Sequence, residues 1–589
     1  MNPETIPAKE PAAPDLLGGI GELDSPRNLT LLRAAFWAIA ILAGFLQAWA
    51  ARFAVTPDGT CYLDIASAYL RGDWHNALNS YWSPFFSWLL ALAMGIFHPV
   101  PYWESTLLHF VNFAGFLVAL ATFEFFFRSL LRLGKDSPSS EHAEPALPEF
   151  GWWLLGYGLF LSTTLSLLPA TYTTPDIWVS AFTYIVAGLV LRIRIAGGGW
   201  RLFALLGLTL ALAYLTKTFY FPMSFVFLFA GWMAAGNPRR TARQAALGAM
   251  VFLAVAGPWI FVLSRSRQRF TFGDVGKLAF AITVDQVPQF FWQGENGSGV
   301  PTHSVRQLLA HPHIFEFASP IGGTYPPAFD QPYWMEGVRP HLRLPGLLRV
   351  LRQSAGTLFQ IYQVQLEYAV LSLAFFFAAA SRAAWWKLFR RQAYFWLPPL
   401  VACSSYAIVL VEFRYVAPFV LLLWLAAISS FLSMRSEIPR RFLFALILAA
   451  VCVTGLKDAK LAVSDLLAIR SSGQNVDWEV AQALGKLNLQ LGDSVAGLSR
   501  VAESHWARLA GVRIVAEIPL GDEDIFWESS PEAKQKVFRI LAGTGAKMVV
   551  TKFAPPSAAN EGWIPLGNTS FYVHPLAAGA SANSTDRKP

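Results

Sequence analysis

Long apolar segments recur along most of this 589-residue chain and constrain its fold more than any other feature. Hydrophobic residues make up 54% of the sequence and charged residues only 14%, which is more apolar surface than one water-soluble core can bury. A helix needs roughly 20 apolar residues to cross a bilayer. The sequence therefore predicts a mainly α-helical, polytopic membrane protein.

About eleven segments are predicted to be transmembrane helices from their length and hydropathy. They lie near 32–52, 104–127, 151–168, 175–192, 202–216, 219–236, 246–264, 364–381, 393–411, 415–432 and 442–456. The first is too long and begins too late to be a signal peptide, so we interpret it as a retained anchor. The three cysteines match no disulfide or metal framework.

Basic residues gather in alternate connections between the apolar segments. If the N-terminus is cytoplasmic, every predicted cytoplasmic loop carries such residues, as the positive-inside rule requires of a protein in the cytoplasmic membrane. They are Arg128, Arg132, Lys135, Arg192, Arg194, Arg201, Arg239, Arg240, Arg243, Arg382, Lys387, Arg390, Arg391, Arg435, Arg440 and Arg441. The net charge of +8 therefore indicates topology and not a nucleic-acid partner. The short outer connections contain only Arg71, Lys217 and Arg414, which makes these three candidates for function.

Two long connections are predicted on the outer side. The loop 53–103 has the residue spacing of two amphipathic helices, near 60–70 and 82–97, lying along the membrane surface. The loop 265–345 is rich in Gly, Pro, His and aromatic residues and shows no periodic pattern. A structureless loop of that length usually has a function.

From residue 457 the composition is that of a soluble protein. The segments SVAGL (494–498), RIVAEI (513–518), KMVVT (548–552) and a terminal FYVHP are predicted strands, separated by helical stretches. We therefore expect a small α/β domain. The chain divides into a cytoplasmic tail (1–30), a transmembrane domain with its outer loops (31–456) and an extracytoplasmic domain (457–589).

The segment TPDGTCYLDIASAYLRGDW, from Thr56 to Trp74, places Asp58, Asp64 and Asp73 at the mouth of a membrane segment. Carboxylates are costly there unless they are partnered or used. A transferase outside the cytoplasm has no supply of nucleotide sugars, so it draws on a lipid-borne donor. That reaction needs a base for the incoming hydroxyl or amine, cations for the departing phosphate, and a groove for the lipid.

The same segment resembles the first outer loop of GT-C type lipid-linked sugar transferases, notably glycosyltransferase family 39, which includes the protein O-mannosyltransferases and the bacterial aminoarabinose transferases. SPFFSWLLAL (83–92) and AYLTKTF (213–219) resemble two further segments of that family. The resemblance implies a GT-C-like transmembrane domain. It also implies transfer of a hexose or pentose from a polyprenyl-phosphate donor to a lipid, glycan or protein acceptor on the extracytoplasmic face.

The resemblance also implies roles for individual residues. Asp58 takes the position of the family's catalytic Asp and is expected to be the general base, while Tyr62 and Asp64 match a later Tyr and acid. Two positions depart from the family: Gly59 replaces the second acid of an Asp-Glu pair, and Ser83 replaces a lysine. No signature of transfer to asparagine is found.

Lys217 and Arg414 are expected to hold the donor phosphate, because a cation at the outer end of an apolar segment needs an anionic partner. Asp176 and Arg265, also near outer helix ends, are candidates for supporting the site.

Each of these residues has a simpler interpretation. Asp58 and Asp176 would cap helices. Asp64 lies roughly 120° around a helix from Asp58, which suits a residue that is solvated or pairs with another helix. Lys217 would reach lipid headgroups with its long side chain. Arg414 would pair with Glu412, and Arg265 would face headgroups.

The histidines of the long outer loop, at positions 303, 311 and 313, match no metal-ligand motif. No metal site is predicted and no cofactor is indicated, although a need for a divalent metal stays open. The competing function is a transporter or lipid flippase, and a third is a noncatalytic scaffold built on the outer tail. Ionisable residues at outer helix ends and two unlike halves of the chain favour the transferase over the transporter.

Overall fold

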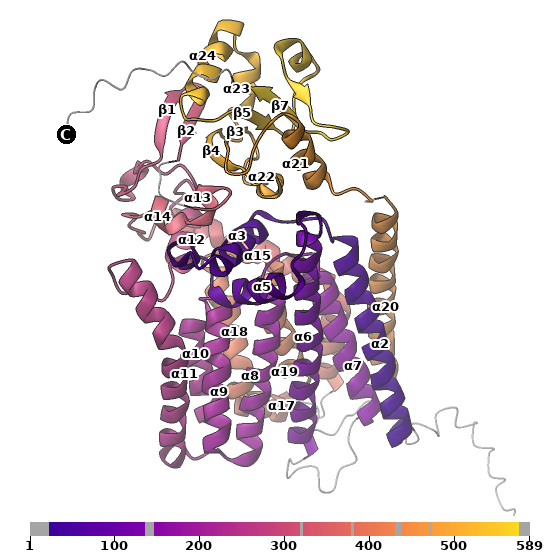
Figure 1. Cartoon of the computed structure of the whole chain (residues 1–589). Helices are drawn as coiled ribbons and strands as arrows, with labels where there is room; N and C mark the ends of the chain where they lie inside the picture. The colour runs from indigo at the N-terminus through magenta and orange to yellow at the C-terminus, as the bar shows by residue number, and fades with distance from the viewer. Residues whose placement is uncertain are drawn as a thin grey trace, which may run out of the picture.

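The computed structural model describes residues 23–135, 147–317, 322–378, 382–429, 439–471 and 473–576. The larger part is a bundle of helices (Figure 1). Each predicted apolar segment coincides with one of them: α2 (Pro26–Ala50), α6 (Glu104–Lys135), α7 (Glu149–Leu161), α8 (Asp176–Ala196), α9 (Trp200–Thr216), α10 (Tyr220–Ala234), α11 (Pro238–Ser266), α16 (Leu366–Ala378), α18 (Ala393–Ala407), α19 (Phe413–Ser429) and α20 (Arg440–Ser471).

Within the described ranges, α2, α6, α8, α11 and α20 contain segments that are long and apolar enough to cross a membrane, and shorter apolar helices accompany them. The predicted polytopic α-helical architecture is therefore confirmed. Residues 1–22 of the predicted tail, residues 577–589 of the predicted outer domain, and Arg435 lie outside the described residues.

Aromatic side chains fill the middle of the bundle. Phe123 and Phe126 of α6 are fully buried, and the Phe123 ring packs edge-on against Tyr184 of α8 at a centroid distance of 5.5 Å. Gly188 lets the two helices approach, since a Cβ there would lie 2.5 Å from the Phe125 ring. This close contact fixes α8, and with it the position of Asp176 at its first turn.

One end of the bundle is covered by α3 (Pro57–Leu70) and α5 (Pro84–Phe97), and we call it the capped end (Figure 1). The short helix α4 (Trp74–Ala77) lies between them in the chain. The predicted helices near 60–70 and 82–97 correspond to α3 and α5. Both begin with a Pro at the first helical position, where its missing N–H costs nothing. α3 ends at Leu70 with Arg71 as its C-cap, after which Gly72 takes a left-handed conformation at φ 68°.

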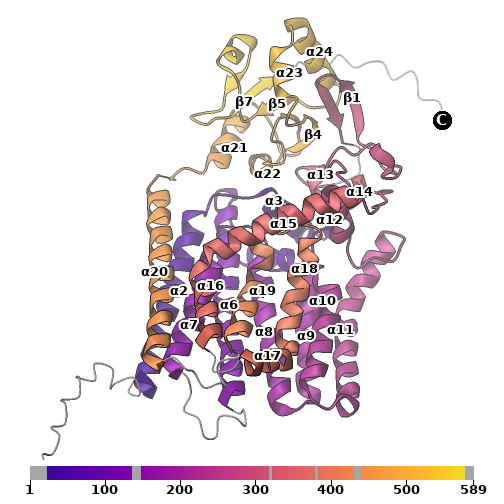
Figure 2. The ribbon, with the colours of Figure 1, turned by 180° about the vertical axis from the view of Figure 1, so that it is seen from behind.

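The expectation of a structureless loop over 265–345 is wrong. The described part of this loop contains α12 (Val275–Thr283), β1 (Arg306–Ala310), β2 (His313–Glu316), α13 (Pro326–Phe329) and α14 (Gln331–Trp334). After it, α15 (Leu344–Val364) runs obliquely across the outside of the bundle toward α16 (Figure 2). The two strands escaped prediction because they are stabilised by pairing with a distant part of the chain and not by a local pattern.

A mixed sheet lies above the capped end (Figure 1). Its strand order is β1-β2-β4-β3-β5-β7-β6, where the last five are β3 (Ser494–Leu498), β4 (Arg513–Ile518), β5 (Met548–Thr551), β6 (Ile564–Pro565) and β7 (Tyr572–Pro575). β3 is parallel to β4 and β5, and β2 pairs antiparallel with β4. All four predicted strands are present.

The sheet is flanked by α21 (Val476–Lys486), α22 (His505–Ala510), α23 (Glu523–Glu528) and α24 (Pro531–Ala542). Residue 457, where the composition changes, lies inside α20, which continues to Ser471. The sheet therefore combines strands from the outer loop with strands from the C-terminal part, and the proposed division at 456/457 stays a prediction.

Candidate active site

Asp58 lies in the first turn of α3, but it does not cap the helix. The N-cap residue is Thr56, whose hydroxyl accepts a hydrogen bond from the Gly59 N–H at 3.3 Å and lies 2.5 Å from Thr173 Oγ1. The Asp58 side chain is 34% exposed. Its carboxylate is therefore not needed for capping and is open to solvent at the capped end.

The structure explains the glycine that follows Asp58. A Cβ at Gly59 would lie 2.4 Å from Thr173 Oγ1 and 2.8 Å from Thr173 Cβ, which is too close for any side chain. α3 thus packs directly against the segment that precedes α8. The second acid of the Asp-Glu pair has no room in this chain.

Arg414, in the first turn of α19, connects two carboxylates. Its Nη2 donates a hydrogen bond to Asp58 Oδ2 at 3.3 Å, and its Nε lies 3.8 Å from Asp176 Oδ2. Its Nη1 donates to Thr174 Oγ1 at 3.1 Å. No ion pair with Glu412 occurs among the described residues, so the local pairing considered from the sequence is replaced by contacts with α3 and α8.

Lys217 follows the last residue of α9 and also turns inward. Its Nζ donates to Asp176 Oδ1 at 2.5 Å and lies 3.4 Å from the ring centroid of Tyr415. A cation above an aromatic face is attracted by the ring. Lys217 therefore has partners inside the protein and does not extend toward lipid headgroups.

Asp176 holds these two cations together. It is only 3% exposed, and besides Lys217 and Arg414 it accepts a hydrogen bond from Thr174 Oγ1 at 2.7 Å. A carboxylate this far from water is stable only when it is paired and hydrogen-bonded. The sequence allowed Asp176 either to cap a helix or to lie beside the candidate site. In the structure it lies beside Lys217 and Arg414.

Asp58, Asp176, Lys217 and Arg414 form what we call the ion cluster. Two carboxylates face two cations, so their formal charges cancel. The Lys217 and Arg414 side chains are 20% and 15% exposed, less than Asp58 and more than Asp176. The cluster is therefore anchored by a buried acid and presents one accessible acid.

Tyr62, Asp64 and Arg265 are not members of the ion cluster, although Tyr62 lies near two of its carboxylates. Tyr62 is buried between Trp82 and Phe86, and burial, followed by the nearby Asp58 and Asp176 carboxylates, raises its pKa well above that of an ordinary phenol. Asp64 is bound to other residues, described below, and Arg265 is exposed in the last turn of α11. Neither is brought to the cluster.

Ser83, in the place of the family's lysine, joins α5 to the turn that carries Lys217. It is the N-cap residue of α5, and its hydroxyl lies 3.1 Å from Thr218 Oγ1 and accepts a hydrogen bond from the Thr218 N–H at 3.1 Å. Sequence reasoning missed Thr173, Thr174 and Tyr415. The only signals for them were their places beside Asp176 and Arg414 in the sequence.

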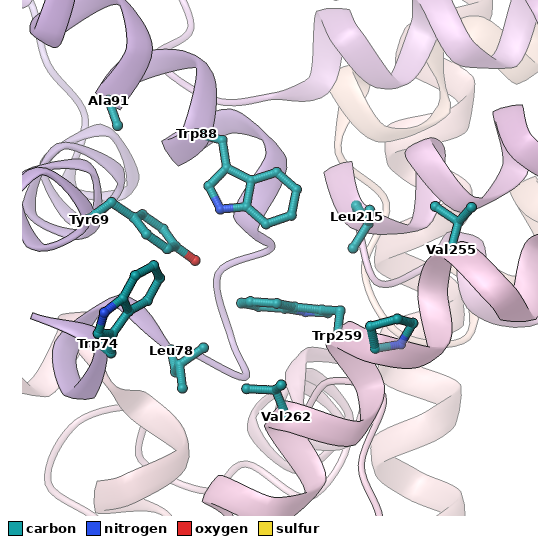
Figure 3. Close-up of a pocket in the computed structure, with 10 residues that line it drawn as sticks. Tyr69, Trp74, Leu78, Trp88, Ala91, Leu215, Val255, Trp259 and Val262 are labelled. Carbon is teal, nitrogen blue, oxygen red and sulfur yellow. The ribbon is translucent and has the colours of Figure 1, made fainter. Parts of the chain in front are cut away.

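An apolar cavity of about 830 Å³ lies between the surface helices and the bundle (Figure 3). Its lining is Tyr69, Trp74, Leu78, Trp88, Ala91, Leu215, Val255, Pro258, Trp259 and Val262. The rings of Trp88 and Trp259 meet edge to face at 6.0 Å. Leu215 stands two residues before Lys217, so the cavity reaches the part of α9 that ends at the ion cluster.

Metal-binding groups are not evident in the described part of the chain, where no cluster of three or more His, Cys, Asp or Glu residues is arranged to hold an ion. The loop histidines have other partners. His303 stacks on Tyr333 at 4.0 Å, and His313 Nδ1 lies 2.7 Å from Asp522 Oδ2.

No protein-family model and no curated protein matches the sequence. Among solved structures, the chain is similar to ArnT from Cupriavidus metallidurans bound to undecaprenyl phosphate. That similarity has a TM-score of 0.50 at 13% identity and covers 94% of this chain and 99% of ArnT. The chain has the GT-C fold. The resemblance drawn from the sequence is thus confirmed for the fold, and at this identity the likeness does not extend to activity.

Two structures of the Archaeoglobus fulgidus oligosaccharyltransferase also align with this chain, at 13% identity. One is a complex with zinc and sulfate, with a TM-score of 0.42 over 87% of this chain and 67% of that protein. The other is tethered to an acceptor peptide, with a TM-score of 0.44 over 87% and 68%.

Proposed function

We propose that this protein is an integral membrane glycosyltransferase that moves a sugar from a polyprenyl-phosphate donor to an acceptor at the capped end. The observation that carries the proposal is the ion cluster. It combines an accessible carboxylate, Asp58, with two cations. It lies at the end of α9, and Leu215 of the same helix lines a large apolar cavity. The GT-C fold is consistent with this chemistry but does not by itself assign it.

Asp58 is the general base in this proposal. It takes the proton from the acceptor hydroxyl or amine as that atom forms a bond to the anomeric carbon of the sugar. The bond between the anomeric carbon and the phosphate oxygen breaks, and its electron pair leaves with the phosphate. Because phosphate is a good leaving group, no general acid is required.

Arg414 and Lys217 stabilise the phosphate. Both are already held by Asp176, so they are fixed in place before the donor arrives, which is how preorganised charges favour a transition state. Arg414 also contacts Asp58, and its guanidinium has further N–H donors with which to bind phosphate oxygens. The base and the leaving-group cations are thereby held at one place.

The apolar cavity would hold the lipid chain of the donor. Its volume of about 830 Å³ lies within the 300–1,000 Å³ that is usual for ligand sites, and its walls are mainly aromatic and aliphatic. ArnT was solved with undecaprenyl phosphate, a lipid of the same class. The walls come from both the surface helices and the bundle.

We further propose that the capped end faces out of the cytoplasm in the cytoplasmic membrane. α17 (Arg382–Arg391), with basic residues in its last turn, lies at the opposite end of the bundle, and the turns between α8 and α9 and between α10 and α11 lie there too (Figure 2). Arginines flank these turns, at Arg192, Arg194, Arg239 and Arg240. The positive-inside rule assigns this basic end to the cytoplasm.

Replacing the base tests the proposal. In vesicles supplied with radiolabelled undecaprenyl-phosphate sugars, Asp58→Asn should lower sugar transfer by about 10²–10⁴-fold, since the amide keeps the shape but cannot take a proton. Asp524→Asn, an exposed carboxylate of α23, is the control and should leave transfer unchanged. Full turnover by a correctly folded Asp58→Asn protein would remove the proposed base.

A further inference from the structure

A second cavity, of about 330 Å³, lies where α3, the outer loop and the C-terminal part meet. Its lining is Asp64, Ser67, Ala68, Arg71, Asn76, Gly322, Gly323, Thr324, Phe329, Arg508, Gly511, Val512 and Arg513. Unlike the lining of the apolar cavity, its lining includes charged, amide and hydroxyl side chains beside small and apolar ones. Its volume is at the lower end of the range for small-ligand sites and suits a group the size of one sugar.

α3 separates the two cavities. Asp64, Ser67, Ala68 and Arg71 follow the spacing of three and four residues that places side chains on one helix face, and all four line the second cavity. Tyr69 points from the opposite side of the helix and lines the apolar cavity. Asp58 stands at the N-terminal end of this partition.

The second cavity carries an excess of positive charge. Its lining holds three guanidinium groups and a single carboxylate, Asp64. Asp64 accepts hydrogen bonds from Arg508 Nη1 at 2.6 Å and from the Thr324 N–H at 2.7 Å, and it shares Arg508 with Glu104 of α6. Arg71 is exposed and Arg513 adds another guanidinium to the lining. Asp73, the acid beside Arg71 in the chain, does not line the cavity, and Asn76 Nδ2 donates to its carboxylate at 2.7 Å.

We propose that this cavity binds an oxyanion carried by the acceptor, so that α3 receives the lipid donor on one face and an anionic acceptor on the other. This inference rests on the proposed function. Along the helix axis Asp64 is about 9 Å from Asp58, and Arg71 is about 20 Å from it, at 1.5 Å per residue. The acceptor therefore has its attacking hydroxyl or amine roughly 10–20 Å from its phosphate or carboxylate.

Binding to the purified full-length protein in phosphatidylcholine nanodiscs tests the inference without requiring turnover. Calorimetric titration should show binding of glucose 6-phosphate, and weaker or no binding of glucose. Arg71→Glu should weaken glucose 6-phosphate binding about tenfold or more, because a charged hydrogen bond becomes a repulsion. Arg71→Lys should retain most of it, and Arg352→Glu, an exposed arginine of α15 outside both cavities, should not change it.

A second experiment distinguishes two sources of the anion, a lipid headgroup and a soluble glycan. If nanodiscs that contain phosphatidylglycerol compete with glucose 6-phosphate, the ligand is a lipid headgroup. If they do not compete, the ligand is a soluble glycan anion. Three results would overturn the inference. They are equal binding of glucose 6-phosphate by the original protein and by Arg71→Glu, equal affinity for glucose and glucose 6-phosphate, and no binding of glucose 6-phosphate.

The same titration separates this inference from the proposed function. Asp58→Asn should bind glucose 6-phosphate normally while losing sugar transfer. If Asp58→Asn transfers sugar at full rate but Arg71→Glu loses binding, the proposed base fails while the anion site stands. If Arg71→Glu binds the anion normally while Asp58→Asn loses transfer, the anion site fails and the transferase stands.

Discussion

At the scale of single residues, the two carboxylates of the ion cluster differ mainly in exposure, and that difference assigns them different roles. Asp176 is nearly inaccessible and has three partners, Thr174, Lys217 and Arg414, so the role we propose for it is to hold the two cations. Asp58 has one cationic partner and contact with solvent. A group that must accept a proton from an acceptor has to be reachable, and only Asp58 meets that condition.

The pairing of Asp176 with Lys217 can be separated from catalysis by a double substitution. Lys217→Met alone should destabilise the protein by about 3–5 kcal/mol, because it leaves part of a buried charge unpaired. Asp176→Asn together with Lys217→Met should recover most of that stability, since both charges are removed, but not the sugar transfer. Thermal unfolding in detergent and transfer in vesicles measure the two effects. If the double variant is as unstable as Lys217→Met, the unpaired Asp176 charge is not the reason for the lost stability.

A side chain at Gly59 should be poorly tolerated. Gly59→Ala should cost about 1–3 kcal/mol, because its Cβ would overlap Thr173. Gly356→Ala in α15 is the matched control: its Cβ would meet no atom within 4 Å, so it should be neutral or slightly stabilising. Thermal unfolding compares the two variants. Equal stability of Gly59→Ala and Gly356→Ala would contradict the close packing of α3.

At the scale of elements, the C-terminal part is joined to α3 through an arginine of α22, Arg508, whose side chain is only 12% exposed. Arg508 donates to Asp64 and to Ser67 Oγ of α3, at 2.6 and 2.7 Å, and to both carboxylate oxygens of Glu104 at the start of α6. These carboxylates keep the pKa of Arg508 above its ordinary value despite burial. Asp64 is therefore part of the joint that holds the helix on which Asp58 lies.

Removing this arginine should loosen α3. Arg508→Ala should cost about 3–5 kcal/mol, since it leaves two buried carboxylates without a cation. It should also raise hydrogen exchange in α3 more than in the bundle helices. Lys552→Ala, which breaks a partly exposed pair with Glu503 in the same part of the chain, should cost less than about 1 kcal/mol. Unchanged exchange in α3 would show that other contacts hold it.

At the scale of the whole molecule, distant segments complete one another. The ion cluster draws on α3, α8, the turn after α9, and α19, while the sheet takes β1 and β2 from the outer loop. The C-terminal part is therefore not an independent appendage. Phe315 of β2 stands opposite Glu517 of β4, at the seam between the loop and the C-terminal strands.

Glu517 should make this seam sensitive to pH. Burial raises its pKa from 4.5 to about 8, and a hydrogen bond with Tyr325 offsets the rise only in part. The folded protein then binds a proton that the unfolded chain has released. The contribution of Glu517 to the stability of the folded protein should be greatest below pH 4.5 and should fall as the pH rises to about 8.

Glu517→Gln should flatten that dependence, because the amide does not ionise. Thermal unfolding between pH 5 and pH 8 measures how the stability changes with pH. Hydrogen exchange over the same range shows whether the change occurs in the β-sheet. Glu532→Gln, an exposed residue of α24, should leave the pH slope unchanged. An identical slope in Glu517→Gln would contradict the buried protonated carboxyl.

The sequence by itself determined the parts of this protein that depend on neighbouring residues. Apolar length predicted the bundle helices, and short buried segments predicted β3, β4, β5 and β7. The pattern after the first apolar segment predicted Asp58 at the start of a surface helix. Lys217 and Arg414 stood out because cations are costly at apolar helix ends. These signals are local, so they could be read without knowing the fold.

Only the tertiary structure decided which of these residues meet. Asp58 and Arg414 are 356 positions apart, and no periodicity relates them. Asp64 and Asp58 lie on one helix, yet the fold sends Asp64 to Arg508, 444 positions away. Contacts across such separations depend on how helices and strands pack, which is a property of the assembled chain and not of any segment in it.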